Sequence, residues 1–151
     1  MKIALGSDEK TSLTDSVHTQ LVDAGHEITQ FGPIAGAQEY WPAVARQVAE
    51  AVTSGRCDEG ILLCWTGTGV SMAANKVTGV RAALCVDAQT ARGARLWNNA
   101  NILCLSLRLC SAAVAHEILD AWFETSYLPN PEDDACLAQL EALEQAYHQH
   151  V

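Results

Sequence analysis

The sequence has few basic residues and no long apolar segment. Nine lysines and arginines stand against eighteen acidic residues, and the formal net charge is -9 at pH 7. A surface of this sign disfavours nucleic acid and anionic membranes as partners. The first ten residues contain only a short apolar run before Gly6 and Asp8, so we expect neither a signal peptide nor a membrane span. These features predict a cytoplasmic protein with no nucleic acid partner and no membrane partner.

Cysteine is present but lacks the spacing of a disulfide framework or a metal site. The six cysteines are widely spread, with no CxxC pair and no histidine at metal-ligand spacing. We interpret them as reduced thiols and expect no metal and no cofactor. A chain of 151 residues can bury roughly 68 to 70% of its unfolded surface, which is enough for one core without disulfides. We predict a single domain over residues 1–151.

Short runs of branched apolar residues alternate with longer segments of helical periodicity. This alternation indicates an α/β fold in which helices cover both faces of a parallel sheet. The expected strands are residues 2–6, 26–31, 59–64, 80–85 and 101–106. The expected helices between and after them are residues 11–24, 42–54, 70–76, 88–97 and 112–123.

A last helix is expected over residues 131–148. The acidic run at 132–134 suits its first turn, because the helix dipole favours negative charge there. The helix then carries an apolar stripe formed by Leu137, Leu140, Leu143 and Tyr147. Such a stripe has to be buried on the same domain or on a second subunit. We favour the second subunit and therefore predict a homodimer.

Open parallel sheets bind ligands at the carboxyl ends of their strands, where the strand order reverses. The first expected strand ends in Gly6-Ser7-Asp8 and brings a carboxylate to that edge. An Asx turn or a helix cap is the alternative role for Asp8.

The third expected strand ends in the loop Cys64-Trp65-Thr66-Gly67-Thr68-Gly69, directly before a helix. Its amides and hydroxyls can hold an anion or an oxyanion at the positive helix end, and that end also favours the thiolate form of a cysteine. The loop lacks the GK[ST] ending of a Walker motif. A small buried apolar residue at a strand end is the alternative role for Cys64.

Several segments occur in the order and at the spacing of one known family. They are residues 1–8, 58–64, 71–76, 79–85 and 90–92, followed by Asn98 to Asn101. The chain resembles the ribose-5-phosphate isomerase B / galactose-6-phosphate isomerase family from residue 1 to about 127, and the run AANK followed by GVRAALC is the most specific part. The resemblance implies a three-layer Rossmann-like sandwich that works as a dimer, with each active site lined by both subunits.

The resemblance also implies an aldose–ketose isomerase that works through a cis-enediolate. Cys64 matches the family's cysteine base, and Asp8 matches its aspartate after the first strand. Asn98 matches an asparagine of its motif before the fifth strand, and Arg108 matches a phosphate-contacting arginine. The base needs donors for the developing oxyanion, and the loop beside Thr66 offers amides for it.

Three polar positions depart from the family pattern. Glu9 stands where the family has a histidine, and Trp97 replaces the histidine that assists ring opening. Asp133 or Asp134 and Leu137 stand where the family has two phosphate-binding arginines. Carboxylates near a phosphate dianion repel it, by ~1 kcal/mol or more per pair even in water. We therefore expect a substrate that is a non-phosphorylated or otherwise atypical sugar.

A further departure is aromatic. Trp41 replaces a pocket tyrosine and Trp65 replaces a glycine beside the cysteine, in addition to Trp97. Indoles recognise the apolar faces of sugars, so these three residues predict a carbohydrate platform, and the alternative is a pocket that they fill and inactivate. We place Trp122 in the core.

Other polar residues have weaker claims to a site. Arg92 and Arg95 are interpreted as solvated helix charges, whereas Glu9 is either a second acid or base or an exposed turn carboxylate. His26, like the other histidines within helices or strands, is assigned no role. Two further functions stay open beside the favoured one: a sugar-phosphate isomerase of the usual type that uses Arg108, and a non-catalytic sugar-binding or regulatory subunit.

Overall fold

The computed structural model of this chain describes residues 1–148, and it consists of twelve elements. In chain order they are β1 (Lys2–Ser7), α1 (Ser12–Asp23), β2 (Glu27–Phe31), η1 (Gly32–Ala35), α2 (Trp41–Thr53), β3 (Glu59–Cys64), α3 (Thr68–Ala74), β4 (Ala82–Leu84), α4 (Ala88–Asn98), β5 (Ile102–Ser106), α5 (Ala112–Glu124) and α6 (Pro131–His148). No helix within residues 1–148 has the length and apolar character needed to span a membrane.

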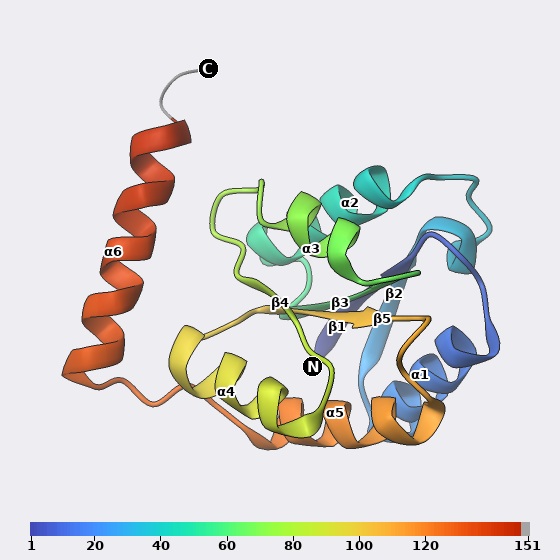
Figure 1. Cartoon of the computed structure of the whole chain (residues 1–151). Helices are drawn as coiled ribbons and strands as arrows, with labels where there is room; N and C mark the ends of the chain where they lie inside the picture. The colour runs from blue at the N-terminus through green and yellow to red at the C-terminus, as the bar shows by residue number, and fades with distance from the viewer. Residues whose placement is uncertain (149–151) are drawn as a thin grey trace.

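The five strands form one parallel sheet in the order β2-β1-β3-β5-β4, with helices on both faces. Helices α2 and α3 cover one face, and α1, α4 and α5 cover the other (Figure 1). The predicted three-layer α/β sandwich is therefore confirmed. Each face has its own cluster of buried apolar residues, because strands covered on both sides send apolar side chains in both directions.

Strand β4 is shorter than the predicted run of residues 80–85. The backbone N–H of Arg81 donates to the side-chain oxygen of Asn101 at 2.8 Å, and the Arg81 side chain donates to the Asn99 carbonyl at 2.7 Å. These bonds add to backbone bonds at the start of this edge strand, because the Arg81 carbonyl also accepts from the amides of Asn101 at 3.0 Å and Ile102 at 3.4 Å. A hydrophobicity pattern does not show the side-chain bonds.

A buried ion pair holds the sheet edge at which the strands begin, and it corrects the interpretation of Arg95 as a solvated charge. Its guanidinium lies 2.6 Å from the Glu59 carboxylate and donates to the carbonyls of Ala100 and Thr125. Trp122 is fully buried, as predicted, and its indole N–H donates to the other Glu59 oxygen at 2.6 Å. Burial raises the pKa of Glu59, and Arg95 opposes that rise. Helical periodicity did not reveal the pair because Glu59 comes from a distant strand.

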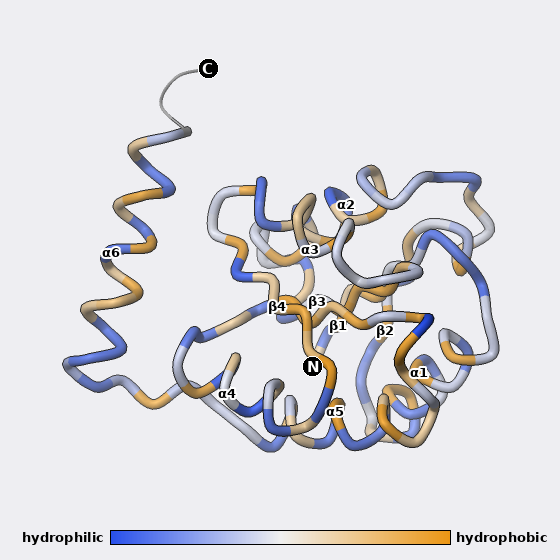
Figure 2. The backbone as a smooth tube through the Cα atoms, in the orientation of Figure 1, coloured by the Kyte–Doolittle hydropathy of each residue, from blue (hydrophilic) through white to orange (hydrophobic). Residues whose placement is uncertain are grey.

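Helix α6 projects away from the sandwich (Figure 1). In Figure 2 its tube alternates between hydrophobic and hydrophilic segments, and Leu143 and Tyr147 of the predicted stripe are exposed, Tyr147 by 77%. A contact with the body is made by Glu144, whose two carboxylate oxygens accept from the Gly79 amide at 3.0 Å. The stripe is therefore not buried on its own domain, and its burial on a second subunit stays a prediction.

Candidate active site

Asp8 and Cys64 are neighbours at the carboxyl edge, the sheet edge at which the strands end. Ser7 pairs with Leu63, so Asp8 comes one residue later beside Cys64, and Cys64 pairs in turn with Ser106 of β5. Neighbouring strands lie about 4.8 Å apart, and residues in register point to the same face. The chain continues from β1 to one side of the sheet and from β3 to the other, so this row lies at the switch point of the strand order.

The Asp8 carboxyl group is partly buried and has an unsatisfied oxygen. Burial raises its pKa, and the neighbouring Glu9 carboxylate adds to the rise. Its Oδ1 atom is buried and has no hydrogen-bond partner within residues 1–148. The alternative role as a helix cap belongs to Thr11 instead, whose hydroxyl accepts from the Thr14 amide. Asp8 is thus available for a ligand, and its raised pKa makes its carboxylate a better proton acceptor than a free aspartate.

The Cys64 side chain packs with the buried cluster under α2 and α3, and only 5% of the residue is exposed. Its carbonyl accepts from the amides of Gly67 at 3.2 Å and Leu107 at 3.0 Å. The thiol is therefore largely buried, and hydrogen bonds fix the backbone position of its residue. Access for a substrate depends on the short loop that follows it.

The loop after Cys64 is held in one conformation by Gly67, which has a positive φ of 74°. A Cβ at this position would lie 2.5 Å from the Leu84 side chain, so both the backbone angle and the space require glycine. Gly67 is the N-cap of α3, and no side chain caps that helix. The hydroxyls of Thr66 and Thr68 are hydrogen-bonded to each other at 2.7 Å. The amides of the first turn, at Thr68 and Gly69, therefore lack a side-chain cap at this edge.

Two of the predicted aromatic residues flank the loop. The indole of Trp41 packs against Gly69, where a Cβ would lie 3.1 Å from the ring. The side chain of Trp65 is on the loop itself, and 57% of the residue is exposed. Arg108 is exposed at the same edge, and its backbone amide donates to the Trp65 carbonyl at 2.9 Å.

Trp97 and Asn98 lie at the opposite edge. They end α4, shortly before β5 begins at Ile102, and Ile102 pairs with Gly60. Gly60 precedes Cys64 by four residues, which is about 13 Å along a strand. The Trp97 indole folds back over Gly93 of its own helix. One chain therefore does not bring these two residues to Cys64.

Ser106 was missed by the sequence interpretation. Its buried hydroxyl donates to the Trp65 carbonyl at 3.0 Å and accepts from the Leu109 amide at 3.2 Å, so it joins the two loops that follow β3 and β5. Its position was the available signal. Ser106 is a polar residue at the end of β5, just as Asp8 is a polar residue directly after β1. No group of three or more His, Cys, Asp or Glu side chains in the described part of the chain is arranged to hold a metal ion.

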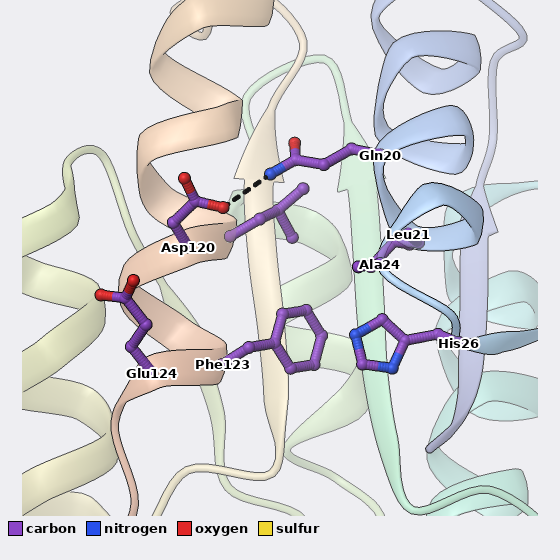
Figure 3. A pocket seen from close by; sticks show the side chains of 8 residues that line it. Gln20, Leu21, Ala24, His26, Asp120, Phe123 and Glu124 are labelled. Carbon is purple, nitrogen blue, oxygen red and sulfur yellow. Dashed lines mark hydrogen bonds between the residues drawn. The ribbon is translucent and has the colours of Figure 1, made fainter.

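A hollow with a volume of about 300 Å³ lies away from this row, between the ends of α1 and α5. Figure 3 shows the rings of His26 and Phe123 facing each other, with centroids 4.5 Å apart, below the hydrogen bond from Gln20 to Asp120. Burial lowers the pKa of His26, and the amino-terminal charge adds to this effect. The hollow contains none of the residues predicted for the site.

A sequence model of one family, described as ribose/galactose isomerase, matches residues 3–138. The chain belongs to this isomerase family. Galactose-6-phosphate isomerase subunit LacB of Clostridium acetobutylicum is 33% identical over 144 residues, which cover 95% of this chain and 83% of that protein. Ribose-5-phosphate isomerase B of Escherichia coli is 38% identical over 127 residues, which cover 83% of this chain and 85% of that protein.

Solved structures of the ribose/galactose isomerase family agree with the fold. Ribose-5-phosphate isomerase B of Clostridium thermocellum superposes with a TM-score of 0.91 at 37% identity, covering 97% of this chain and 99% of that one. The predicted family, fold and aldose–ketose isomerase class are confirmed. These comparisons do not identify the sugar, because the relatives are named after different substrates.

Proposed function

We propose that this chain interconverts an aldose and a ketose through a cis-enediolate, with Cys64 as the base and a non-phosphorylated sugar as the substrate. The observation that carries the proposal is the register of Asp8 beside Cys64, next to the uncapped first turn of α3.

The reaction needs one group that moves a proton from C2 to C1 and another that moves a proton from O2 to O1. The Cys64 thiolate takes the proton from C2 of the aldose, and the electrons of that C–H bond form the C1–C2 double bond as the carbonyl becomes an oxyanion. Amides at Thr68 and Gly69 stabilise this oxyanion. The Asp8 carboxylate takes the O2 proton and delivers it to O1, and the thiol then returns its proton to C1, which leaves the ketone at C2.

The charges around the proposed site argue against a phosphate group. Glu9 follows Asp8 directly at the carboxyl edge. By the resemblance, Asp133 or Asp134 and Leu137 stand at the positions of the family's phosphate-binding arginines, and the two carboxylates accept hydrogen bonds from Asn130 and Tyr127 at 2.6 Å. A phosphate dianion beside such groups meets ~1 kcal/mol of repulsion per pair, even with the dielectric constant of water.

We further propose that two copies of this chain complete each site in the cytoplasm. Trp97 and Asn98 reach Cys64 only from a second copy, because they lie at the opposite sheet edge of their own chain. The exposed stripe of α6 offers the apolar surface for such a pairing. Reduced cysteines support the cytoplasm, since all six are free thiols.

Exchange of solvent deuterium into sugar carbons tests the proposed base. Free aldoses and ketoses, and their phosphorylated forms, are incubated with the protein in D2O and analysed by mass spectrometry. We expect exchange into a free sugar with the native chain and with Cys57→Ala, a buried thiol away from the crevice, and none with Cys64→Ala. Equal exchange by Cys64→Ala would remove Cys64 as the base.

A sugar-phosphate isomerase of the usual type remains the second candidate. Arg108 favours it, because this cation is exposed at the same edge as Cys64. It requires exchange into the phosphorylated sugars and competition by inorganic phosphate at low salt. The third candidate is a regulatory subunit, which would bind a sugar without exchanging its protons. The low exposure of Cys64 favours this candidate.

A further inference from the structure

A cleft of about 330 Å³ opens at the carboxyl edge, between the first turns of α1 and α5. We name it the Trp65 cleft, and Thr11, Leu13, Trp65, Leu107, Ser111 and Ala112 contribute to its lining. Small-molecule sites begin at about 300 Å³, and one water takes about 30 Å³ in the liquid. The cleft therefore has room for several carbons of a sugar with their hydroxyl groups.

The walls of the Trp65 cleft continue from the catalytic row. Thr11 and Leu13 belong to the segment after Asp8, and Trp65 directly follows Cys64. Leu107 follows β5, and its amide donates to the Cys64 carbonyl at 3.0 Å. The cleft wall is thus joined to the backbone of Cys64 by a hydrogen bond.

The lining of the cleft contains no carboxylate, lysine or arginine. Its one titratable group is the Cys110 thiol, and burial raises the pKa of that thiol, so it stays neutral. The hydroxyls of Thr11 and Ser111 already cap their helices by accepting from Thr14 and Val114 amides. An exposed indole beside leucine side chains and hydroxyl groups suits a ligand with an apolar face and hydroxyl edges.

We propose that the Trp65 cleft is a subsite that receives the uncharged, hydroxyl-bearing far end of the substrate, and that it excludes a terminal phosphate. This inference rests on the proposed function, because it assigns C1 and C2 of the sugar to Cys64. The residues that line the cleft then discriminate between sugars with and without a terminal phosphate.

Two neighbouring alanines in the first turn of α5 provide a matched test. Ala112 lines the cleft and Ala113 does not, and both are exposed, so methionine is accommodated at either position. Deuterium exchange is measured for Ala112→Met and Ala113→Met with a free pentose or hexose and with glyceraldehyde, which is too short to fill the cleft. Tryptophan fluorescence is titrated with the same sugars and with their terminal phosphates, and Trp65→Phe identifies the part of the signal that comes from Trp65.

We expect Ala112→Met to raise KM for the long free sugar by about tenfold, which corresponds to about 1.4 kcal/mol, because the longer side chain occupies part of the cleft. Exchange into glyceraldehyde should not change, and Ala113→Met should behave as the native chain. Free sugars should quench Trp65, and phosphorylated ones should quench it less.

Three results would overturn the subsite. They are equal KM values for the two methionine variants, stronger quenching by the phosphorylated sugar, and no quenching of Trp65 by any sugar. Failure of the proposed function has a different signature, which is the absence of exchange into glyceraldehyde and into every longer sugar. In that case quenching of Trp65 by free sugars, and its loss in Ala112→Met, still decides whether the cleft binds them.

Discussion

The buried pair of Glu59 and Arg95 allows a quantitative test of what holds the sandwich together. Replacing Arg95 with methionine leaves the Glu59 carboxylate with the Trp122 indole as its remaining donor and removes two hydrogen bonds to carbonyls. Breaking a buried ion pair from one side costs about 3–5 kcal/mol. For a domain of this size each kcal/mol shifts Tm by about 2–4 °C, so we expect Arg95→Met to melt about 6–20 °C lower.

The double variant Arg95→Met with Glu59→Gln separates charge from packing. Glutamine removes the uncompensated carboxylate and keeps an acceptor for the Trp122 indole, so much of the lost stability should return. Urea unfolding followed by the fluorescence of Trp122, which is fully buried, gives the four free energies of the cycle.

The pH dependence gives an independent check with a definite sign. Burial raises the folded-state pKa of Glu59 above its ordinary value of 4.5, so its contribution to stability is greatest below pH 4.5 and is lost as the pH rises through the folded pKa. Without Arg95 the folded pKa rises further, and the cost of Arg95→Met should therefore be smaller at pH 5 than at pH 8. A loss below about 1 kcal/mol at pH 8, or a double variant no more stable than the single one, would refute this account of the pair.

Three further expectations concern the site and the assembly. Gly67→Ala should destabilise the chain by more than Gly36→Ala in thermal melts, because both have positive φ but only Gly67 lacks space for a Cβ, and equal losses would contradict this reasoning. Asp8→Asn should abolish deuterium exchange and yet raise the unfolding free energy at neutral pH, because burial penalises the ionised Asp8 carboxylate, and a less stable variant would contradict the sign. Leu143→Ser on the α6 stripe should shift the chain toward monomers in sedimentation velocity while Gln145→Ser on the same helix should not, and no shift would leave α6 outside the interface.

The order of the elements could be predicted because each strand is a short apolar run and each helix has a regular apolar period. The start of β4 could not, because Arg81, which precedes the strand, is bonded to the Asn99 carbonyl and the Asn101 side chain, 18 and 20 positions away. The same limit explains Arg95. From the sequence alone, Arg95 is a charged residue on a helix, and such residues are usually solvated. In the fold, β3 places the Glu59 carboxylate next to it.

The candidate site was predictable to the extent that its residues follow strand ends. Asp8 and Cys64 were both assigned to the carboxyl edge, and the register places them side by side. The edge at which Trp97 and Asn98 lie was also implied by sequence position, because they end the expected helix 88–97 and a helix returns the chain to the start of the sheet before β5 begins. Their assignment to the substrate site stays a prediction that requires a second copy.

The separation of the tryptophans changes what the aromatic departures mean. Trp41 and Trp65 flank the loop after Cys64, whereas Trp97 lies at the other edge over Gly93. The three indoles therefore do not form one platform within a chain. Filling the crevice with indole would require Trp41 or Trp65 to cover the row of Asp8 and Cys64, but Trp65 instead lines a cleft on the side of α1 and α5. Trp65 thus offers binding surface in that cleft, whereas the Trp41 indole packs against Gly69 in the first turn of α3. The choice between altered substrate recognition and a filled pocket therefore depends on Trp41.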